Sequence, residues 1–142
     1  MPRTTLSTLK SAATTACLAG ALTATMLAAP AHAGGSVAFT LTPTSAQDAQ
    51  AMRAGLTIYS LVNGFSSGSG ITQNGFANIA GLAQNGTGNV GVVHQQGSGH
   101  SGTLTQNGNG NAHGLFQFGS GSDANVVQNG NGDTGATFAF GW

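Results

Sequence analysis

The feature of this 142-residue sequence that most constrains its fold is a glutamine that returns every eleven residues. A glycine stands two places after each of these glutamines. The glutamines are Gln73, Gln84, Gln95, Gln106, Gln117 and Gln128, and the glycines are Gly75, Gly86, Gly97, Gly108, Gly119 and Gly130. A fixed period of this kind indicates a repeat architecture, although the abundance of Gly, Asn, Gln and Ser would otherwise suggest disordered low-complexity sequence.

Two kinds of eleven-residue unit alternate, so the true period is 22 residues. The units that begin at Gln84, Gln106 and Gln128 share the pattern Asn-Gly-x-Gly, whereas the units between them vary. Asn-Gly and Gly-x-Gly favour turns, because both residue types reach positive φ at low cost. The six or seven residues between turns, such as "HSGTLTQ", have the length of a strand. The sequence therefore predicts two strands and two turns in each period.

Alternation along each strand assigns the side chains to an inner and an outer face. Stacked copies lie about 4.8 Å apart, and a primary amide both donates and accepts, so an inward amide can bond to the copy above it. The predicted inward amide ladders comprise the six glutamines together with Asn78, Asn89 and Asn111. The predicted aliphatic core comprises Ile71, Leu82, Val93, Leu104, Leu115 and Val126. We expect an all-β β-solenoid of about three and a half coils, amyloid-like when assembled.

The outer face contains aromatic residues at the same spacing. Phe116 and Phe138 are 22 residues apart, as are Phe118 and Phe140, so both pairs are expected to stack on neighbouring coils. We interpret them as an outward aromatic ladder that stabilises the solenoid, or alternatively as a patch for lateral bundling or adhesion. Other outward positions, such as Val90, Thr103 and Asn125, are expected to tolerate alanine.

The first 33 residues have the pattern of a secretory signal peptide. Arg3 and Lys10 precede an apolar stretch, which ends at the small-x-small sequence 31–33, and no second apolar span follows it. The protein is therefore expected to be secreted, without a transmembrane segment in the mature chain. Cys17, the only cysteine, would leave with the signal peptide.

Residues 34–66 form an N-terminal segment that does not repeat clearly. The sequence "SVAFTLTP" predicts a short strand, and Ser45 is placed to cap a helix that follows it. We expect this segment to cover the first coil or to act in export or docking. Residues 67–142 then form the repeat domain.

Few charges remain after the signal peptide, and they exclude several functions. The charged residues are Arg53, Asp48, Asp123 and Asp133, which give no basic face for nucleic acid or anionic lipid. No nucleophile and base stand in a recognisable pattern, so we expect neither an enzyme nor a cofactor.

Three histidines are the only candidates for metal ligation. Alternation places His94 outward, whereas His100 and His113 point inward on different strand series. This arrangement does not predict a shared metal site.

Apart from the segment 34–66, the sequence predicts no cover over either end of the solenoid. The last strand, "TGATFAFGW", runs to the C-terminus, and residues 54–142 contain no Lys, Arg, Pro or Glu. Natural edge strands commonly use such residues to prevent pairing. An open end that matches the opposite end of another molecule gives a non-closing contact, which generates filaments.

The stretch "NIAGLAQNGTGNVGVVHQ" resembles the curlin repeat, which runs Ser/Asn, five residues, Gln-x-Gly-x-Gly-Asn-x-Ala/Gly, three residues, Gln. The resemblance covers about residues 67–142. It implies a subunit, major or nucleating, of curli, the extracellular functional amyloid fibres of bacterial surfaces, which serve in adhesion and biofilm matrix. It also implies partners, namely other curlin-type subunits and an outer-membrane export machinery. His113 at an alanine-like site and Ala139 in place of a terminal glutamine depart from the pattern.

A monomeric secreted solenoid that binds a surface or a carbohydrate is the alternative to a fibre subunit. A flat array of outward threonines, as an ice-binding surface requires, is not expected, because only Thr103 and Thr105 form such a pair.

Overall fold

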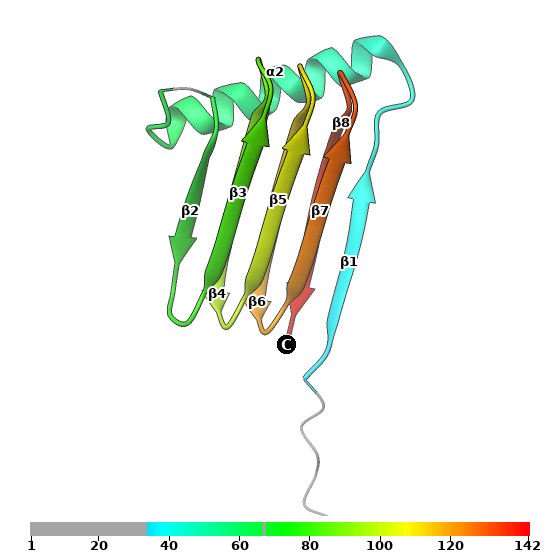
Figure 1. Cartoon of the computed structure of the whole chain (residues 1–142). Coiled ribbons are helices and arrows are strands. Elements are labelled where there is room, and N and C mark those ends of the chain that lie inside the picture. Colours follow the sequence, from blue (N-terminus) through cyan, green and yellow to red (C-terminus); the bar gives the residue numbers. More distant parts are fainter. Residues whose placement is uncertain (1–33, 67) are drawn as a thin grey trace, which may run out of the picture. The chain divides into compact units, whose positions relative to one another are not determined.

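The computed structural model describes residues 34–66 and 68–142 (Figure 1). A strand, β1 (Ser36–Leu41), and a helix, α2 (Ala46–Val62), come first. Seven strands follow: β2 (Gly70–Asn74), β3 (Ile79–Asn85), β4 (Val90–Ser98), β5 (Ser101–Asn107), β6 (Ala112–Ser120), β7 (Asp123–Asn129) and β8 (Thr134–Gly141). The predicted signal peptide lies outside the described residues.

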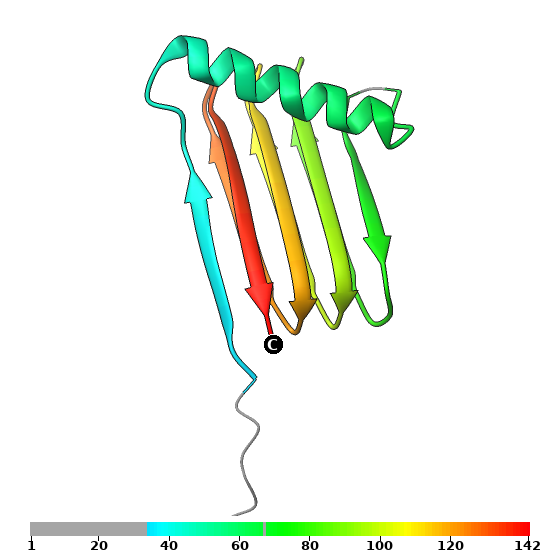
Figure 2. The same ribbon diagram turned by 180° about the vertical axis from the view of Figure 1, so that it is seen from behind.

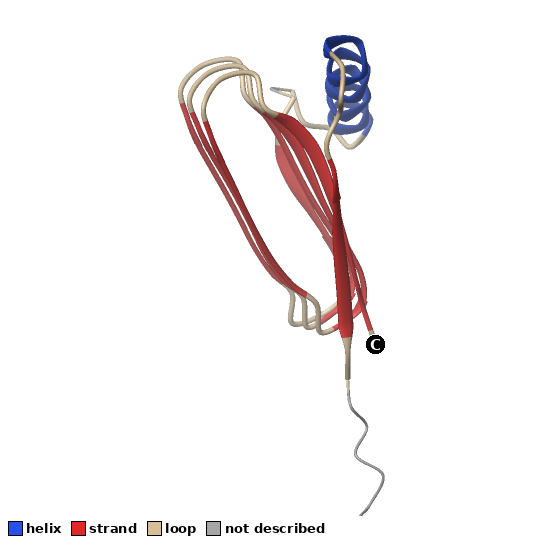
Figure 3. Cartoon of the chain, turned by 90° about the vertical axis from the view of Figure 1, so that its right-hand side faces the viewer, coloured by secondary structure: helices blue, strands red, loops and turns tan. Residues whose placement is uncertain are grey.

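The strands form two sheets that face one another (Figure 3). Sheet A has the order β1-β8-β6-β4-β2, and sheet B has the order β3-β5-β7. From β2 onward the chain alternates between the sheets, and each strand pairs in parallel with the strand one period later. Gln84, for example, lies opposite Gln106, which lies opposite Gln128. The chain is therefore a β-solenoid with 22-residue coils, as predicted. The coils are β2–β3, β4–β5 and β6–β7, and β8 begins a fourth.

The turn glycines are required by the close approach of successive coils. Gly108 has a φ of 116°, in the region that favours glycine. A Cβ atom at Gly108 would collide with the carbonyl oxygen of Gly130 on the next coil. The same collision with the next coil would occur at Gly75, Gly86, Gly97 and Gly119, and positive φ holds for these four glycines and for Gly130. The repeat of glycine therefore follows from the stacking distance as well as from turn conformation.

The core between the sheets consists of aliphatic columns. Val93, Leu104 and Leu115 are fully buried and pack together. Leu82 and Val126 pack against them from the flanking coils, in the register predicted from the period. Ile71 continues the column of Val93 onto β2, where it is 37% exposed because no coil lies beyond it.

The helix α2 begins where the sequence predicts it. Ser45 is the N-cap, and its side chain accepts a hydrogen bond from the backbone N–H of Asp48. The helix crosses the strands of sheet A on the face away from sheet B (Figures 2 and 3). Its 17 residues span about 25 Å, enough for the four spacings of a five-stranded sheet, about 19 Å.

The predicted cap over the first coil is wrong, and so is the prediction that the last strand has no cover. β1 pairs antiparallel with β8, with Ser36 opposite Gly141 and Leu41 opposite Ala136. The N-terminal segment therefore covers the edge of the last strand, at the opposite end of the solenoid from the first coil. Within the described residues, β1, β2, β3 and β7 each have one unpaired edge.

Candidate functional site

The inward glutamines form two ladders, one in each sheet. In sheet A the Nε2 of Gln73 donates to the Oε1 of Gln95, and that of Gln95 donates to Gln117, both at 2.7 Å. In sheet B the same bonds join Gln84 to Gln106 and Gln106 to Gln128, again at 2.7 Å.

Burial of the central glutamines leaves their amide groups well bonded. Gln95, Gln106 and Gln117 are fully buried. The Nε2 of Gln95 also donates to the carbonyl oxygen of Ile79 in the opposite sheet, at 2.8 Å. Gln106 and Gln117 make equivalent bonds, at 3.1 and 3.0 Å. Because unbonded buried amides are costly, this second bond makes glutamine suitable for an interior position.

The inward asparagines join each coil to the next. The Nδ2 of Asn89 donates to the carbonyl oxygen of Gly108, and its Oδ1 accepts from the backbone N–H of Asn111. Asn78 and Asn111 make the same pair of bonds to the coils that follow them. The side chain thereby satisfies a turn carbonyl and a strand N–H that the turn leaves without backbone partners.

The outward phenylalanines stack as predicted on the outer face of sheet A, where Phe116 also contacts Tyr59 of α2. The ring centroids of Phe116 and Phe138 are 5.1 Å apart, and those of Phe118 and Phe140 are 5.5 Å apart. Phe39 of β1 extends the stack, at 5.6 Å from Phe138. Phe39 was not among the residues predicted for this ladder. Its only signal was the alternation of Val37, Phe39 and Leu41 in β1, whose apolar side chains face outward beside the phenylalanines.

The helix is tied to the repeat by one arginine. Arg53 donates to the carbonyl oxygens of Gly88 and Gly110, which are equivalent turn positions on adjacent coils. Leu56 packs between the strands' outward side chains, against Val90 and Ala112. Outward Val90 is consequently buried, which corrects the expectation that it lies free and tolerates truncation.

The three histidines lie in separate environments. His94 points outward and is hydrogen bonded to the hydroxyl of Tyr59, with 2.8 Å between Nδ1 and Oη. His100 is buried, and its Nδ1 lies 2.8 Å from the Oγ of Ser122 on the next coil. Among residues 34–66 and 68–142, no three His, Cys, Asp or Glu side chains lie close enough together to hold a metal ion.

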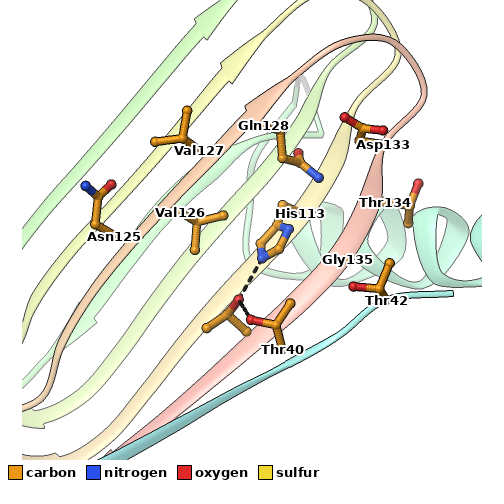
Figure 4. Close-up of a pocket in the computed structure, with 11 residues that line it drawn as sticks. Thr40, Thr42, His113, Asn125, Val126, Val127, Gln128, Asp133, Thr134 and Gly135 are labelled. Carbon is orange, nitrogen blue, oxygen red and sulfur yellow. Dashed lines mark hydrogen bonds between the residues drawn. The ribbon is translucent and has the colours of Figure 1, made fainter.

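His113 lies at the end of the solenoid and is 3% exposed. Its Nε2 is 2.9 Å from the Oγ1 of Thr137, which in turn is 2.8 Å from the Oγ1 of Thr40 in β1 (Figure 4). The Nδ1 has no hydrogen-bond partner among the described residues. Burial lowers the pKa of His113 to about 4, because it disfavours the charged imidazolium.

A cavity of about 400 Å³ opens beside His113 (Figure 4). Val126 and Gln128 of β7 line one side, and Thr40 and Thr137 of β1 and β8 line the other. Sheet A extends past β7 at this end by two strands, β8 and β1, which have no counterpart in sheet B within the described residues. The cavity is therefore the space left by an incomplete coil.

No helix in the described part of the chain has the length and apolar character needed to cross a membrane. The chain matches no protein-family model, no curated protein and no solved structure.

Proposed function

We propose that this protein is a secreted structural subunit that polymerises head to tail into extracellular, curli-like amyloid fibres. The observation that carries the proposal is a parallel solenoid whose sheet B is open at both edges, β3 and β7. The two edges of a parallel sheet differ but are complementary, so one molecule can follow another in the same direction without closing a ring.

The low charge supports the same proposal. In the described chain after residue 53, the only formally charged side chains are Asp123 and Asp133. Stacked copies would bring like charges close together, so a nearly uncharged repeat favours assembly. Adhesion and biofilm matrix as the role of the fibre, and an export machinery and other curlin-type subunits as partners, rest on the resemblance of the repeat.

One observation favours the alternative, a monomeric solenoid that binds a surface or carbohydrate. β1 covers the edge of β8, and the outward stack of Phe39, Phe118 and Phe140 remains partly exposed. In a fibre subunit, β1 acts as a removable cover instead. All six residues of β1 are exposed, so little buried surface opposes its release.

Assembly of the mature chain tests the two functions. Residues 34–142, diluted from denaturant to about 20 µM, should form β-rich, dye-binding fibres after a lag, and sheared fibres should abolish the lag. A chain that stays monomeric for days, with or without seeds, would contradict the fibre proposal and favour the binding module.

Removal of the cover strand sharpens that test. A chain that begins at Thr42 lacks β1, so the edge of β8 is free from the start, and its lag should be shorter at the same concentration. An unchanged or longer lag would show that β1 does not restrain assembly.

A further inference from the structure

The two sheets of the solenoid do not contain equal numbers of repeat strands. Sheet A has β2, β4, β6 and β8, whereas sheet B has only β3, β5 and β7. If β3 of a second molecule paired directly with β7, its β2 would fall at the level of β8 and collide with it. A head-to-tail fibre of this subunit therefore needs one more strand in sheet B, opposite β8. That place is the cavity beside His113.

The sequence contains a segment in the register of the missing strand. Each strand of sheet B has seven residues and ends in Asn, which a positive-φ glycine follows, as in Asn85-Gly86. Twenty-two residues before β3 lies "TIYSLVN", residues 57–63, followed by Gly64 with a φ of 85°. With this segment as a strand, residues 55–142 make 88 residues, four times the 22-residue period.

In the monomer these residues form the C-terminal third of α2 and its C-cap, but their composition favours a strand. Thr, Ile, Tyr and Val are enriched in strands and are mediocre helix formers. Three of the side chains gain little from the helix, because Ile58, Leu61 and Val62 are 62%, 55% and 81% exposed.

The inner face of β8 is complementary to this segment. Across the core, the inward position four residues before each glutamine faces a glutamine of the other sheet. A Cβ atom at Gly91 would lie 2.9 Å from the Nε2 of Gln84, and a Cβ atom at Gly102 would lie 2.9 Å from the Nε2 of Gln95. By that rule Val62 would face Gly135, and Ile58 would face Ala139.

The central position completes the fit, since Ser60 would face Thr137, one hydroxyl against another. Large side chains of the segment thus meet the small residues of β8. On this coil, Ala139 in sheet A and Val62 in sheet B would occupy the positions that glutamine holds on the other coils. Both glutamine ladders would therefore end at the same coil.

We infer that residues 57–63 of a second copy of this chain occupy the site opposite β8, as a strand parallel to β7. Thr57 then pairs with Asp123 and Asn63 with Asn129, in the register that β5 and β7 already share. The strand β2 of the second copy follows on β8, in the place that β1 holds in the monomer. This inference rests on the proposed fibre function and specifies the contact between subunits.

Two single substitutions at neighbouring exposed positions test the inference. Val62→Lys places a charge on the inner face of the proposed strand, whereas Leu61→Lys places the same charge on its outer face. Both positions are exposed on α2, so both monomers should fold with unchanged helix content by circular dichroism. Seeded elongation by Val62→Lys should fall by at least about tenfold, because its charge would be buried without a partner. Leu61→Lys should elongate within about twofold of the unmodified chain.

A cross-link between subunits tests the register directly. The mature chain contains no cysteine, and the proposed pairing places Leu61 of one copy beside Val127 of the next, both facing outward. Fibres of the Leu61→Cys/Val127→Cys variant should give covalent ladders of subunits after treatment with a short bifunctional thiol reagent. Fibres of Val62→Cys/Val127→Cys should not, because residue 62 points inward.

The outcomes separate this inference from the function on which it rests. If the unmodified chain forms fibres but the two lysine variants elongate equally, the inference falls and the fibre function stands. Absence of the 61–127 cross-link in well-formed fibres overturns it as well. If the unmodified chain forms no fibres, the proposed function and the inference fall together.

Discussion

The two sheets of this solenoid are built from the same repeat, yet their outer faces differ. On sheet A, outward Val90 is 7% exposed because it packs against Leu56 of α2, and outward Val92 is fully buried. On sheet B, outward Thr103 and Asn125 are exposed and hydrogen bond only to each other, at 2.8 Å. The central strands β4 and β6 of sheet A have nine residues, whereas every strand of sheet B has seven.

The repeat therefore decides the inner faces, and the non-repeating segment decides the outer ones. Inward columns are alike in both sheets because each coil is the template for the next. Outward side chains have no such partner, so their burial depends on whether α2 or β1 reaches them. Substitutions of equivalent inward residues should therefore change the free energy of unfolding equally in the two sheets, apart from positions where a column is interrupted. Substitutions of equivalent outward residues should change it unequally.

The largest expected effect comes from His113, which interrupts the inner face of sheet A. Its pKa is lowered to about 4 in the folded state, from 6.5 in the unfolded chain. The unfolded chain thus binds this proton first as the pH falls. The free energy of unfolding should fall by about 3 kcal/mol between pH 6.5 and pH 4 from this group alone. Urea unfolding at pH 7.5, 5.5 and 4.5 measures the loss.

The His113→Ala variant isolates this contribution, because every other ionisable side chain is unchanged. Its free energy of unfolding should change less than that of the unmodified chain as the pH falls from 7.5 to 4.5. Parallel pH profiles for the two proteins would contradict the burial of a neutral imidazole.

The second effect compares the outer faces directly. Val90→Ala should lower the free energy of unfolding by about 2 kcal/mol, since it removes buried methyl groups that pack against Leu56 of α2. Thr103→Ala, the matched change on bare sheet B, should cost less than about 0.5 kcal/mol. Denaturant unfolding of both variants gives the comparison. Equal losses would mean that α2 does not cover sheet A in solution.

A smaller effect is expected where α2 is tied to the turns. Arg53→Met keeps most of the side-chain stem but loses the bonds to Gly88 and Gly110, and should cost about 1 kcal/mol of stability. Amide hydrogen exchange should rise in α2 and remain unchanged in sheet B. Faster exchange in both regions would show that the arginine stabilises the whole solenoid rather than the helix contact.

The smallest effect concerns the outward aromatic stack. The coupling between Phe118 and Phe140, measured by a double-mutant cycle of the two changes to leucine, should be about 0.5 kcal/mol. The pair is partly exposed, which keeps the value low. A coupling indistinguishable from zero would make the stack a consequence of register and leave it without a stabilising role.

The coil could be predicted from the repeat alone. The inward positions of Gln95, Leu104 and Asn111, and the positive φ of the turn glycines, all follow from one period and the two-residue alternation of a strand. Such features are predictable because each coil repeats the environment of the coil before it, so a local pattern contains the long-range contact. The helix that starts after Ser45 was predictable for a similar reason, since its cap is local.

The place of the segment before the repeat depends on contacts of the folded chain that no local pattern predicts. β1 has no glutamine or glycine pattern, and it pairs with β8 across about one hundred residues of chain, in the opposite direction to every other strand pair. The same holds for the burial of Val90 and for the contact of Arg53 with two turns. The physical reason is that a repeat specifies its partner by similarity, whereas a unique segment finds its partner only through the shape and chemistry of the folded surface.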